Sequence, residues 1–324
     1  CATPRRYGAA DAMIVIGAEE VARRLDRPAC IALMREAMMA LSGGRSKQLL
    51  RGIIDLGGGD AFGVMPGALD GAGFGAKLVS VFPAAAANGR SHQGAILLFD
   101  RGSGAPVCVV DAGEVTAIRT ACASAAATDA LARADATRLA ILGTGEQAWQ
   151  HALAIRHVRP LERIAIWGRD MEKAAGLAGR IADALALPVE VARTPAEAVR
   201  DADIVCTTTA AAEPILFDGD IAPGTHLNVV GSSRAGPVEI DDALVRRARF
   251  FPDHREGVLA QGAEFLRAKA AGLVDDDHVL AEIGAVYAGT APGRRDAREV
   301  TIYKSLGSIV QDLACAAWLH RTAA

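Results

Sequence analysis

The residues Gly143-Thr144-Gly145-Glu146-Gln147-Ala148 form the glycine-rich segment that most clearly indicates the fold of this chain. It follows a short apolar run at residues 138–142 and opens an amphipathic segment that reaches His157, so it predicts a strand, a tight turn and a helix. In such a turn the first glycine permits the bend, the second lets the backbone approach a pyrophosphate, and the small sixth residue allows close packing of the helix on the strand. The N–H groups that begin the helix then face the phosphates. The stretch therefore predicts a dinucleotide site, with a purely structural glycine turn as the alternative.

A second apolar run, at residues 163–167, begins about twenty residues after the second glycine, where a dinucleotide fold presents its ribose-binding side chain. This run ends in Gly168, Arg169 and Asp170. Gly168 leaves room for a phosphate, and the Arg169 guanidinium can pair with a 2′-phosphate through two parallel hydrogen bonds. We therefore predict that NADP(H) is preferred, with NAD(H) possible. The alternative is a solvated Arg169, with Asp170 capping the next helix or binding the ribose.

The sequence around these two runs alternates between apolar runs of strand length and helical patterns. Helices lie between the earlier strands, an alternation typical of parallel sheets. We therefore predict an α/β fold whose nucleotide domain is a Rossmann domain with a doubly wound parallel sheet. Its strands are expected near residues 138–143, 163–168, 188–192, 203–208, 225–231 and 248–252.

The first part of the chain predicts a domain of mixed α and β structure. Residues 16–41 carry apolar residues at helical spacing and predict two short helices broken near Pro28. Several short strands separated by glycine-rich or Asn-Gly turns predict a mostly antiparallel sheet, followed by an alanine-rich helix at residues 113–133. A last amphipathic helix, at residues 301–319, needs a partner surface, most simply this first domain. The expected strands are residues 53–56, 61–65, 73–82, 94–100 and 106–111.

The length and composition of the chain agree with two domains. At 324 residues, 51% of them hydrophobic, the chain can form two cores. We place an α+β domain at residues 1–126, completed by the C-terminal helix at 301–324, and the Rossmann domain at residues 127–300. A formal net charge of -3 provides no basic surface for nucleic acid or an anionic membrane, so small molecules and copies of itself are the expected partners.

Targeting and metal signals are not found in the sequence. No apolar run approaches the roughly twenty residues that span a bilayer, and the start does not resemble a signal peptide, so we expect a soluble, cytoplasmic protein. The six cysteines are scattered singly, without clustered histidines. We therefore expect neither a metal site nor a disulfide framework.

Several ordered motifs, spread over nearly the whole chain, carry a family resemblance. They are Gly75-Ala76-Lys77-Leu78-Val79-Ser80-Val81-Phe82-Pro83, Ser91-His92-Gln93-Gly94, Leu97-Leu98-Phe99-Asp100, Thr116-Ala117-Ile118-Arg119-Thr120-Ala121, the Gly143 turn and Tyr303-Lys304-Ser305-Leu306-Gly307. Together they resemble the ornithine cyclodeaminase and mu-crystallin family. The resemblance implies a homodimer whose discontinuous N-terminal domain binds substrate and forms the dimer sheet, while the Rossmann domain holds a nicotinamide nucleotide.

The resemblance also assigns substrate contacts. Arg51 and Lys77 match the cationic pair that binds the substrate carboxylate in this family. A fixed carboxylate is needed because C2 of a 2-imino or 2-amino acid must lie against the nicotinamide ring. Lys77, if desolvated, can also release a proton. The alternative for each residue is an ordinary exposed cation.

The cofactor contacts follow from the same resemblance. Positions like Arg119 and Thr120 contact the cofactor phosphates, and those like Ser91 and His92 lie near the nicotinamide, although His92 could be an ordinary loop histidine. Thr207 and Thr208 border the adenosine and ribose, and Ser305 and Leu306 lie beside the nicotinamide. The full set of predicted cofactor residues is Ser91, His92, Arg119, Thr120, Gly143, Thr144, Gly145, Glu146, Gln147, Gly168, Arg169, Asp170, Thr207, Thr208, Val230, Gly231, Ser305 and Leu306.

The segment Val230-Gly231-Ser232-Ser233-Arg234 departs from part of the family. Cyclodeaminases and the related alanine dehydrogenases carry Gly-x-Asp here, and the aspartate handles the amino group of the substrate. This chain has Ser233 at that position and Arg234 after it. Mu-crystallin and the ketimine reductases also have a serine followed by an arginine there. A serine hydroxyl cannot accept a proton from an ammonium near neutral pH, whereas reducing a preformed imine needs only a hydride and one proton. The departure therefore indicates a reductase.

Our hypothesis is an NADPH-dependent ketimine reductase that converts a cyclic 2-imino acid, such as Δ1-pyrroline-2-carboxylate or Δ1-piperideine-2-carboxylate, to the L-amino acid. In it Arg51 and Lys77 bind the carboxylate, Ser233 hydrogen-bonds near the imine nitrogen, and Glu256 lines the far side of the pocket. The proton donor is either Lys77 or a water held by Ser233. The alternatives are a cyclodeaminase-type lyase, an NAD-dependent alanine or amino acid dehydrogenase, and a non-catalytic, crystallin-like protein that binds NADPH and a ligand.

Overall fold

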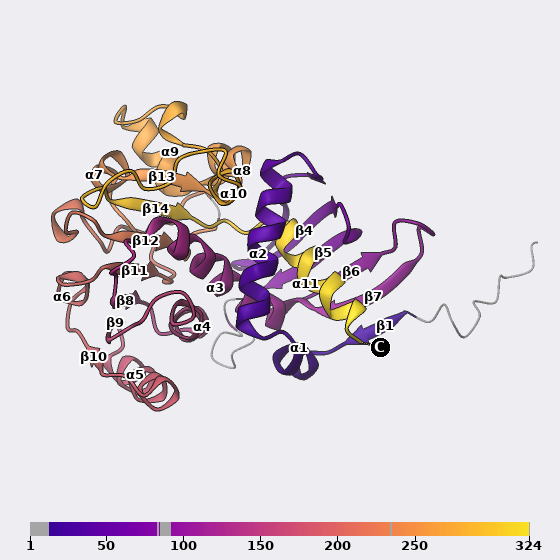
Figure 1. Ribbon diagram of the computed structural model, residues 1–324, viewed down its shortest axis with the longest axis horizontal. Coiled ribbons are helices and arrows are strands. Elements are labelled where there is room, and N and C mark those ends of the chain that lie inside the picture. Colours follow the sequence, from indigo (N-terminus) through magenta and orange to yellow (C-terminus); the bar gives the residue numbers. More distant parts are fainter. Residues whose placement is uncertain (1–12, 83, 85–91, 234, 324) are drawn as a thin grey trace, which may run out of the picture. The chain divides into compact units, whose positions relative to one another are not determined.

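The computed structural model describes residues 13–82, 84, 92–233 and 235–323, and of His92 the backbone alone. The chain divides into two compact units (Figure 1). The first unit comprises Cys1–Asp26, Gly44–Thr116 and Ile309–Ala324, and the second comprises Arg27–Gly43 and Ala117–Ser308.

The domain boundaries expected from sequence differ from these units at residues 27–43, 117–126 and 301–308, which all belong to the second unit. The helix α2 (Arg27–Ser42) belongs to the second unit because it packs on α10 (Ile283–Tyr287). Gly284 has no side chain, and a Cβ there would lie 1.9 Å from the backbone oxygen of Met38. Ser42 Oγ also donates to Glu282 Oε2 at 2.8 Å.

The first unit contains the predicted, mostly antiparallel sheet, in the order β1-β7-β6-β5-β4-β2, with β3 also paired to β4. Its strands are β1 (Ile14–Ile16), β2 (Ser46–Gln48), β3 (Gly52–Gly57), β4 (Asp60–Leu69), β5 (Gly73–Val81), β6 (His92–Phe99) and β7 (Pro106–Asp111). The strands β1 and β2 were not predicted, because they have three residues each and show no alternation long enough to recognise. The short helix α1 (Ala18–Arg24) follows β1, and the two-helix prediction for residues 16–41 is confirmed.

A C-terminal helix, α11 (Ile309–Arg321), lies on β4, β5 and β6 (Figure 1). Two glycines that are partners across β4 and β5, Gly67 and Gly75, allow this close packing. A Cβ at Gly67 would lie 2.6 Å from Ile309 Cγ2, and one at Gly75 would lie 3.4 Å from Leu313 Cδ2. Bare backbone at both positions therefore makes room for one face of α11.

The helix predicted for residues 301–319 is wrong in its first part. Thr301–Lys304 forms a strand, β14, between two parallel neighbours, and the helix begins only at Ile309. Thr301, Ile302 and Tyr303 favour a strand, and Gly307 has a φ of +83°, which a helix does not accommodate. This strand was not predicted because all four of its residues are buried, so the segment shows no alternation of apolar and polar residues.

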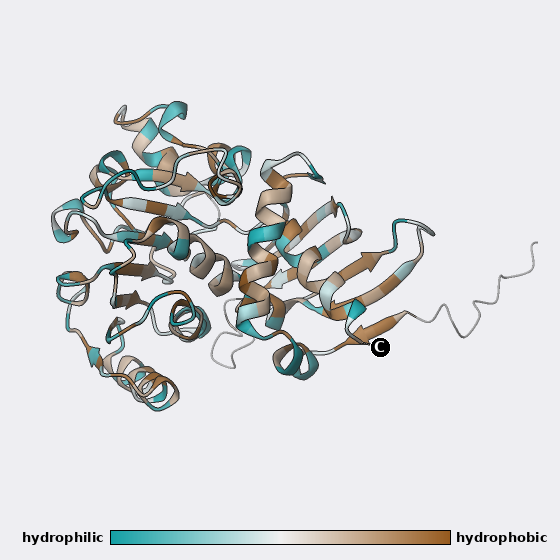
Figure 2. Cartoon of the chain, in the orientation of Figure 1, coloured by the Kyte–Doolittle hydropathy of each residue, from teal (hydrophilic) through white to brown (hydrophobic). Residues whose placement is uncertain are grey.

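The second unit is the predicted doubly wound domain. Its seven strands are all parallel, in the order β10-β9-β8-β11-β12-β14-β13. Besides β14 these are β8 (Arg138–Leu142), β9 (Arg163–Trp167), β10 (Val189–Val191), β11 (Ile204–Thr207), β12 (His226–Val229) and β13 (Arg249–Pro252). The strand order reverses between β8 and β11, and ligands bind at the carboxyl ends of strands at such a point. Figure 2 shows hydrophobic residues along these central strands and hydrophilic residues on the surrounding loops.

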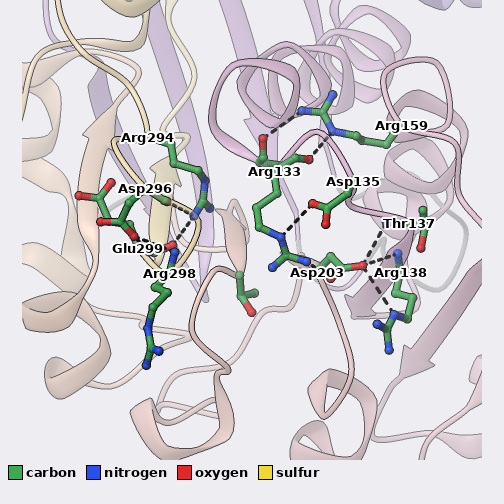
Figure 3. Close-up of polar contacts among 12 residues, drawn as sticks. Arg133, Asp135, Thr137, Arg138, Arg159, Asp203, Arg294, Asp296, Arg298 and Glu299 are labelled. Atoms are coloured by element: carbon green, nitrogen blue, oxygen red, sulfur yellow. Dashed lines mark hydrogen bonds and ion pairs between the residues drawn. The ribbon is translucent and has the colours of Figure 1, made fainter.

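Helices connect the strands of the parallel sheet. The helices are α3 (Ala112–Leu131), α4 (Glu146–Ile155), α5 (Met171–Leu185), α6 (Pro195–Val199), α7 (Asp242–Arg247), α8 (Arg255–Gln261) and α9 (Ala263–Ala270). A buried carboxylate, Asp203, lies at the opposite, amino edge of the sheet, just before β11. It accepts hydrogen bonds from Arg133 and from the backbone of Thr137 and Arg138 (Figure 3). These contacts tie β11 to the start of β8. Within the described ranges, no helix has the length and apolar character of a membrane span.

Replacing Gly75 by Ala is expected to destabilise the first unit by about 2–3 kcal/mol, because the new Cβ would lie 1.9 Å from the backbone oxygen of Leu97 and force strand β6 to move. Chemical denaturation followed by circular dichroism measures this change. Gly52→Ala is the matched control in the same sheet, since its nearest neighbour lies 3.9 Å away. Equal stability of the two variants would contradict this account of the close packing.

Candidate active site

The glycine turn after β8 has the geometry expected of a dinucleotide site. Gly143 has a φ of +132°, and a Cβ there would lie 2.5 Å from Thr208 Oγ1. At Gly145, which caps α4, a Cβ would meet no atom within 4 Å, so the backbone at the start of the helix borders open space. Ala148 is fully buried, as close helix packing requires. The predicted sequence of strand, turn and helix is confirmed, and this turn fits a pyrophosphate.

The end of β9 carries the residues that were predicted to face the ribose of the cofactor. A Cβ at Gly168 would lie 2.3 Å from Thr144 Cγ2, so the second strand approaches the glycine turn closely. Arg169 is exposed. Asp170 caps α5 by accepting hydrogen bonds from the backbone of Glu172 and Lys173, and these contacts lower the pKa of Asp170. The capping alternative for Asp170 is thus what the structure shows, and it leaves the Arg169 guanidinium as the exposed charge beside Gly168.

The two threonines at the end of β11 have different surroundings. Thr207 is fully buried, and its hydroxyl donates to Glu239 Oε2 at 2.7 Å. Thr208 is half-buried and its hydroxyl donates to Leu142 O at 3.2 Å, next to the glycine turn. The structure therefore brings Thr208, rather than the hydroxyl of Thr207, to the predicted cofactor region.

Glu239 is a buried carboxylate that sequence analysis missed. Besides Thr207 it accepts from the backbone and hydroxyl of Thr209 at 2.6 and 2.7 Å and from the backbone of Gly231 at 2.7 Å. Burial raises the pKa of Glu239, and these hydrogen bonds oppose that effect. A Cβ at Gly231 would lie 2.1 Å from Thr209 O, so the glycine is required for this contact. Glu239 therefore joins the end of β11 to the loop that follows β12.

A buried ion pair holds the same loop at its next residue. Lys304 Nζ lies 2.7 Å from Glu264 Oε2, and both side chains are fully buried. Lys304 also donates to the backbone oxygen and the hydroxyl of Ser232 at 2.7 and 2.6 Å, while that hydroxyl donates to Glu264. These contacts fix the backbone directly before the half-buried Ser233. In the sequence, Lys304 belongs to the motif Tyr303-Lys304-Ser305-Leu306-Gly307 of the family resemblance, but no role was predicted for it.

The loop after β14 brings a third group of predicted residues together. Asp253 is fully buried and accepts from the backbone of Leu306 and Gly307 at 2.8 and 2.6 Å; burial raises its pKa. The Arg119 guanidinium lies 2.9 Å from the position of a Cβ on Gly307, so this glycine makes room for it. Ser305 Oγ is buried, and in the described part of the chain it has no hydrogen-bond partner. An unsatisfied buried hydroxyl is costly, and a cofactor amide or hydroxyl would satisfy it.

Lys77 lies in the first unit, on β5, with 4% of its side chain exposed. Its Nζ donates to Thr116 Oγ1 and lies 3.2 Å from Asp312 Oδ1. Arg51 is half-buried directly before β3. Because Gly52 pairs with Val64 and Lys77 with Met65, the register places Arg51 and Lys77 at the same level of the sheet, on opposite sides of β4.

For the other predicted site residues, the structure gives the element on which each lies. Thr120 is buried on α3, and Glu256 is exposed on α8. His92 begins β6, where its backbone pairs with Val81. Ser91 and Arg234 lie outside the described residues.

Metal ligands are not gathered in the part of the chain that the structure describes, where no cluster of three His, Cys, Asp or Glu residues occurs. The cysteines described there are all buried and free: Cys30, Cys108, Cys122, Cys206 and Cys315. Burial raises the pKa of Cys206 to about 12, so its thiol stays protonated at neutral pH.

Comparison with known proteins agrees with this geometry. Residues 12–324 match the model of the ornithine cyclodeaminase/mu-crystallin family. The chain is 37% identical over 226 residues to the ketimine reductase mu-crystallin of Mus musculus, an overlap that covers 70% of this chain and 68% of the relative.

Two solved structures share the fold over nearly the full length. The Thermococcus litoralis Delta(1)-pyrroline-2-carboxylate reductase in complex with NADH and L-proline matches with a TM-score of 0.93 at 30% identity, covering 96% of this chain and 97% of its own. An archaeal alanine dehydrogenase dimer with bound NAD matches with a TM-score of 0.91 at 25% identity, covering 96% of each chain. From its sequence, its fold and the geometry of its glycine turn, the chain belongs to the ornithine cyclodeaminase/mu-crystallin family.

Proposed function

We propose that this chain reduces a 2-imino acid to the corresponding L-amino acid with a nicotinamide dinucleotide as cofactor. Ser233 carries the proposal: it follows a loop held by Glu239, Lys304 and Glu264, and by the family resemblance it takes the place of the aspartate of cyclodeaminases and alanine dehydrogenases. A serine hydroxyl can donate to or accept from an imine nitrogen, but it cannot remove a proton from an ammonium at neutral pH. The names of the mouse and Thermococcus litoralis relatives support the same reaction.

In the proposed reaction, different residues of this chain bind the cofactor, bind the substrate and provide the proton. The backbone at Gly145 and the start of α4 hold the pyrophosphate, and the Ser305 hydroxyl binds a polar group of the cofactor. The bound nicotinamide supplies the hydride that adds to C2 of the imine. Arg51 and Lys77 bind the substrate carboxylate and orient C2. Lys77, or a water held by Ser233, provides the proton that neutralises the nitrogen.

A cyclic five- or six-membered substrate, Δ1-pyrroline-2-carboxylate or Δ1-piperideine-2-carboxylate, is the best supported. Such rings are imines in water without bound ammonia, so the enzyme needs no group that handles free ammonia. The L-proline in the Thermococcus litoralis complex is the product of the five-membered ring. An amino acid dehydrogenase is the second candidate, because the archaeal alanine dehydrogenase shares the whole fold.

NADP(H) is the proposed cofactor in preference to NAD(H). Arg169 is exposed beside Gly168, whose missing side chain leaves space at the end of β9. The Asp170 carboxylate is turned to the backbone of α5 and so does not occupy the phosphate position as an acid would. The exposed guanidinium therefore favours a 2′-phosphate.

A homodimer formed through β3 is the proposed assembly. Every residue of β3 is exposed, and its apolar side chains Ile53, Ile54 and Leu56 are 46%, 57% and 54% exposed. Exposed apolar strands are typical of association surfaces. A second copy is the natural occupant, since the archaeal alanine dehydrogenase of the same fold is a dimer.

The proposed reaction predicts that the purified protein oxidises NADPH when Δ1-pyrroline-2-carboxylate is added and releases L-proline, detected by chromatography. Lys77→Met should lower kcat/KM by about 100-fold, because the carboxylate loses its fixed position. Release of ammonia from alanine or ornithine at a comparable rate, with no reduction of the imine, would instead assign a dehydrogenase or a cyclodeaminase.

Arg169→Ala should raise the KM for NADPH by about 10–100-fold, the loss expected for hydrogen bonds to a charged phosphate, and should leave the KM for NADH within about twofold. Steady-state kinetics with both cofactors provide the comparison. Arg200→Ala removes another exposed arginine, near the amino edge of the sheet, and should change neither value. Equal losses for both cofactors in Arg169→Ala would reject the phosphate assignment.

Ile54→Lys should convert the dimer to a monomer, because burying an unpaired ammonium in the interface costs several kcal/mol. Analytical ultracentrifugation measures the mass in solution. Val15→Lys is the matched control, since Val15 is an apolar residue of β1 in the same sheet and is 69% exposed. An unchanged dimer in Ile54→Lys would place the interface elsewhere.

A further inference from the structure

Asp312, on α11, contacts the lysine to which we assign the substrate carboxylate. Its Oδ1 lies 3.2 Å from Lys77 Nζ, and the two side chains are 0% and 4% exposed. An ammonium or a carboxylate loses its hydration when it is buried, so neither charge is retained in such a place without an opposite charge. Each of these groups is therefore the counter-charge of the other.

The second contact of Lys77 fixes the direction of its ammonium. Thr116 Oγ1 lies 2.6 Å from the backbone oxygen of Ala112, to which its single proton is donated. The lone pairs of this hydroxyl are then left to accept from Lys77 Nζ. Lys77 is thus held by a neutral acceptor on α3 and by a charged acceptor on α11. Two acceptors in fixed positions orient a flexible four-carbon side chain.

The position of Asp312 follows from the close packing of α11 on the sheet. Its neighbours Ile309 and Leu313 lie over Gly67 and Gly75, where a larger residue would push the helix away. Residues 309–317 of this helix are all buried, and most of them are apolar. A carboxylate at such a position adds little to stability, because a buried ion pair is often no better than apolar residues of the same volume. Its presence therefore needs another explanation.

We propose that Asp312 is a positioning residue that keeps the Lys77 ammonium charged and directed for the carboxylate of the substrate. The inference rests on the proposed function, in which Lys77 binds that carboxylate. Asp312 touches neither substrate nor cofactor in this proposal and acts only through Lys77. Without it, the buried lysine sheds its proton or turns away, and the carboxylate loses its partner.

The test compares Asp312→Asn with the wild-type protein. The variant should raise the KM for Δ1-pyrroline-2-carboxylate and the Kd for L-proline, measured by calorimetry on the NADP⁺-loaded protein, by about tenfold or more. The Kd for NADPH should stay unchanged. Cys315→Ala alters a fully buried residue of the same helix and should leave these constants unchanged. A merely structural role would lower the amount of active protein, and so kcat, at unchanged KM and Kd.

A double variant separates action through Lys77 from an independent effect. In the Lys77→Met background, Asp312→Asn should cause no further loss of kcat/KM, since residues that act as a unit are not additive. Losses that multiply, or an unchanged KM and Kd in Asp312→Asn, would overturn the inference while the proposed reaction stands. A wild-type protein that neither reduces the imine nor binds L-proline would overturn both.

Discussion

Buried charged groups at the carboxyl edge of the parallel sheet are the constraint on which the candidate site depends. Parallel strands end with backbone N–H groups that no further strand can satisfy, and buried N–H groups must be paired. Glu239 pairs those of Thr209 and Gly231, and Asp253 pairs those of Leu306 and Gly307. Each carboxylate thereby fixes a loop that carries predicted cofactor or substrate residues.

The cost of burying these carboxylates explains why so many hydrogen bonds converge on them. Burial raises the pKa of both Glu239 and Asp253, and the hydrogen bonds they accept favour the ionised forms. The buried charge of Lys304 is compensated by an ion pair with Glu264 and a hydrogen bond that Lys304 donates to Ser232. Glu239 therefore holds the loop before Ser233 at Gly231, and the Lys304–Glu264 ion pair holds it at Ser232. A serine placed on such a rigid loop can serve a reaction that requires orientation more than proton removal.

Glycines lie where the backbone must closely approach a cofactor, a helix or another strand. Gly143, Gly168 and Gly231 each lie where a Cβ would meet a neighbour at 2.5 Å or less. All three belong to the carboxyl ends of the central strands. In the first unit, Gly67 and Gly75 bring α11 to the sheet, and with it the carboxylate that faces Lys77.

Features that depend on neighbours along the chain could be predicted from the sequence. The turn at Gly143, the cap at Asp170 and the antiparallel strands were recognisable because spacing and turn residues are local signals. The strand β14 was not, because a fully buried strand lacks alternation and the apolar spacing around it also fits a helix. The pairing of the buried charges could not be predicted in this way, because Lys77 and Asp312, like Lys304 and Glu264, are separated by tens to hundreds of residues and meet only in the folded chain. Such pairs form because burial removes water from both partners at once, a condition that exists only after the helices have packed on their sheets.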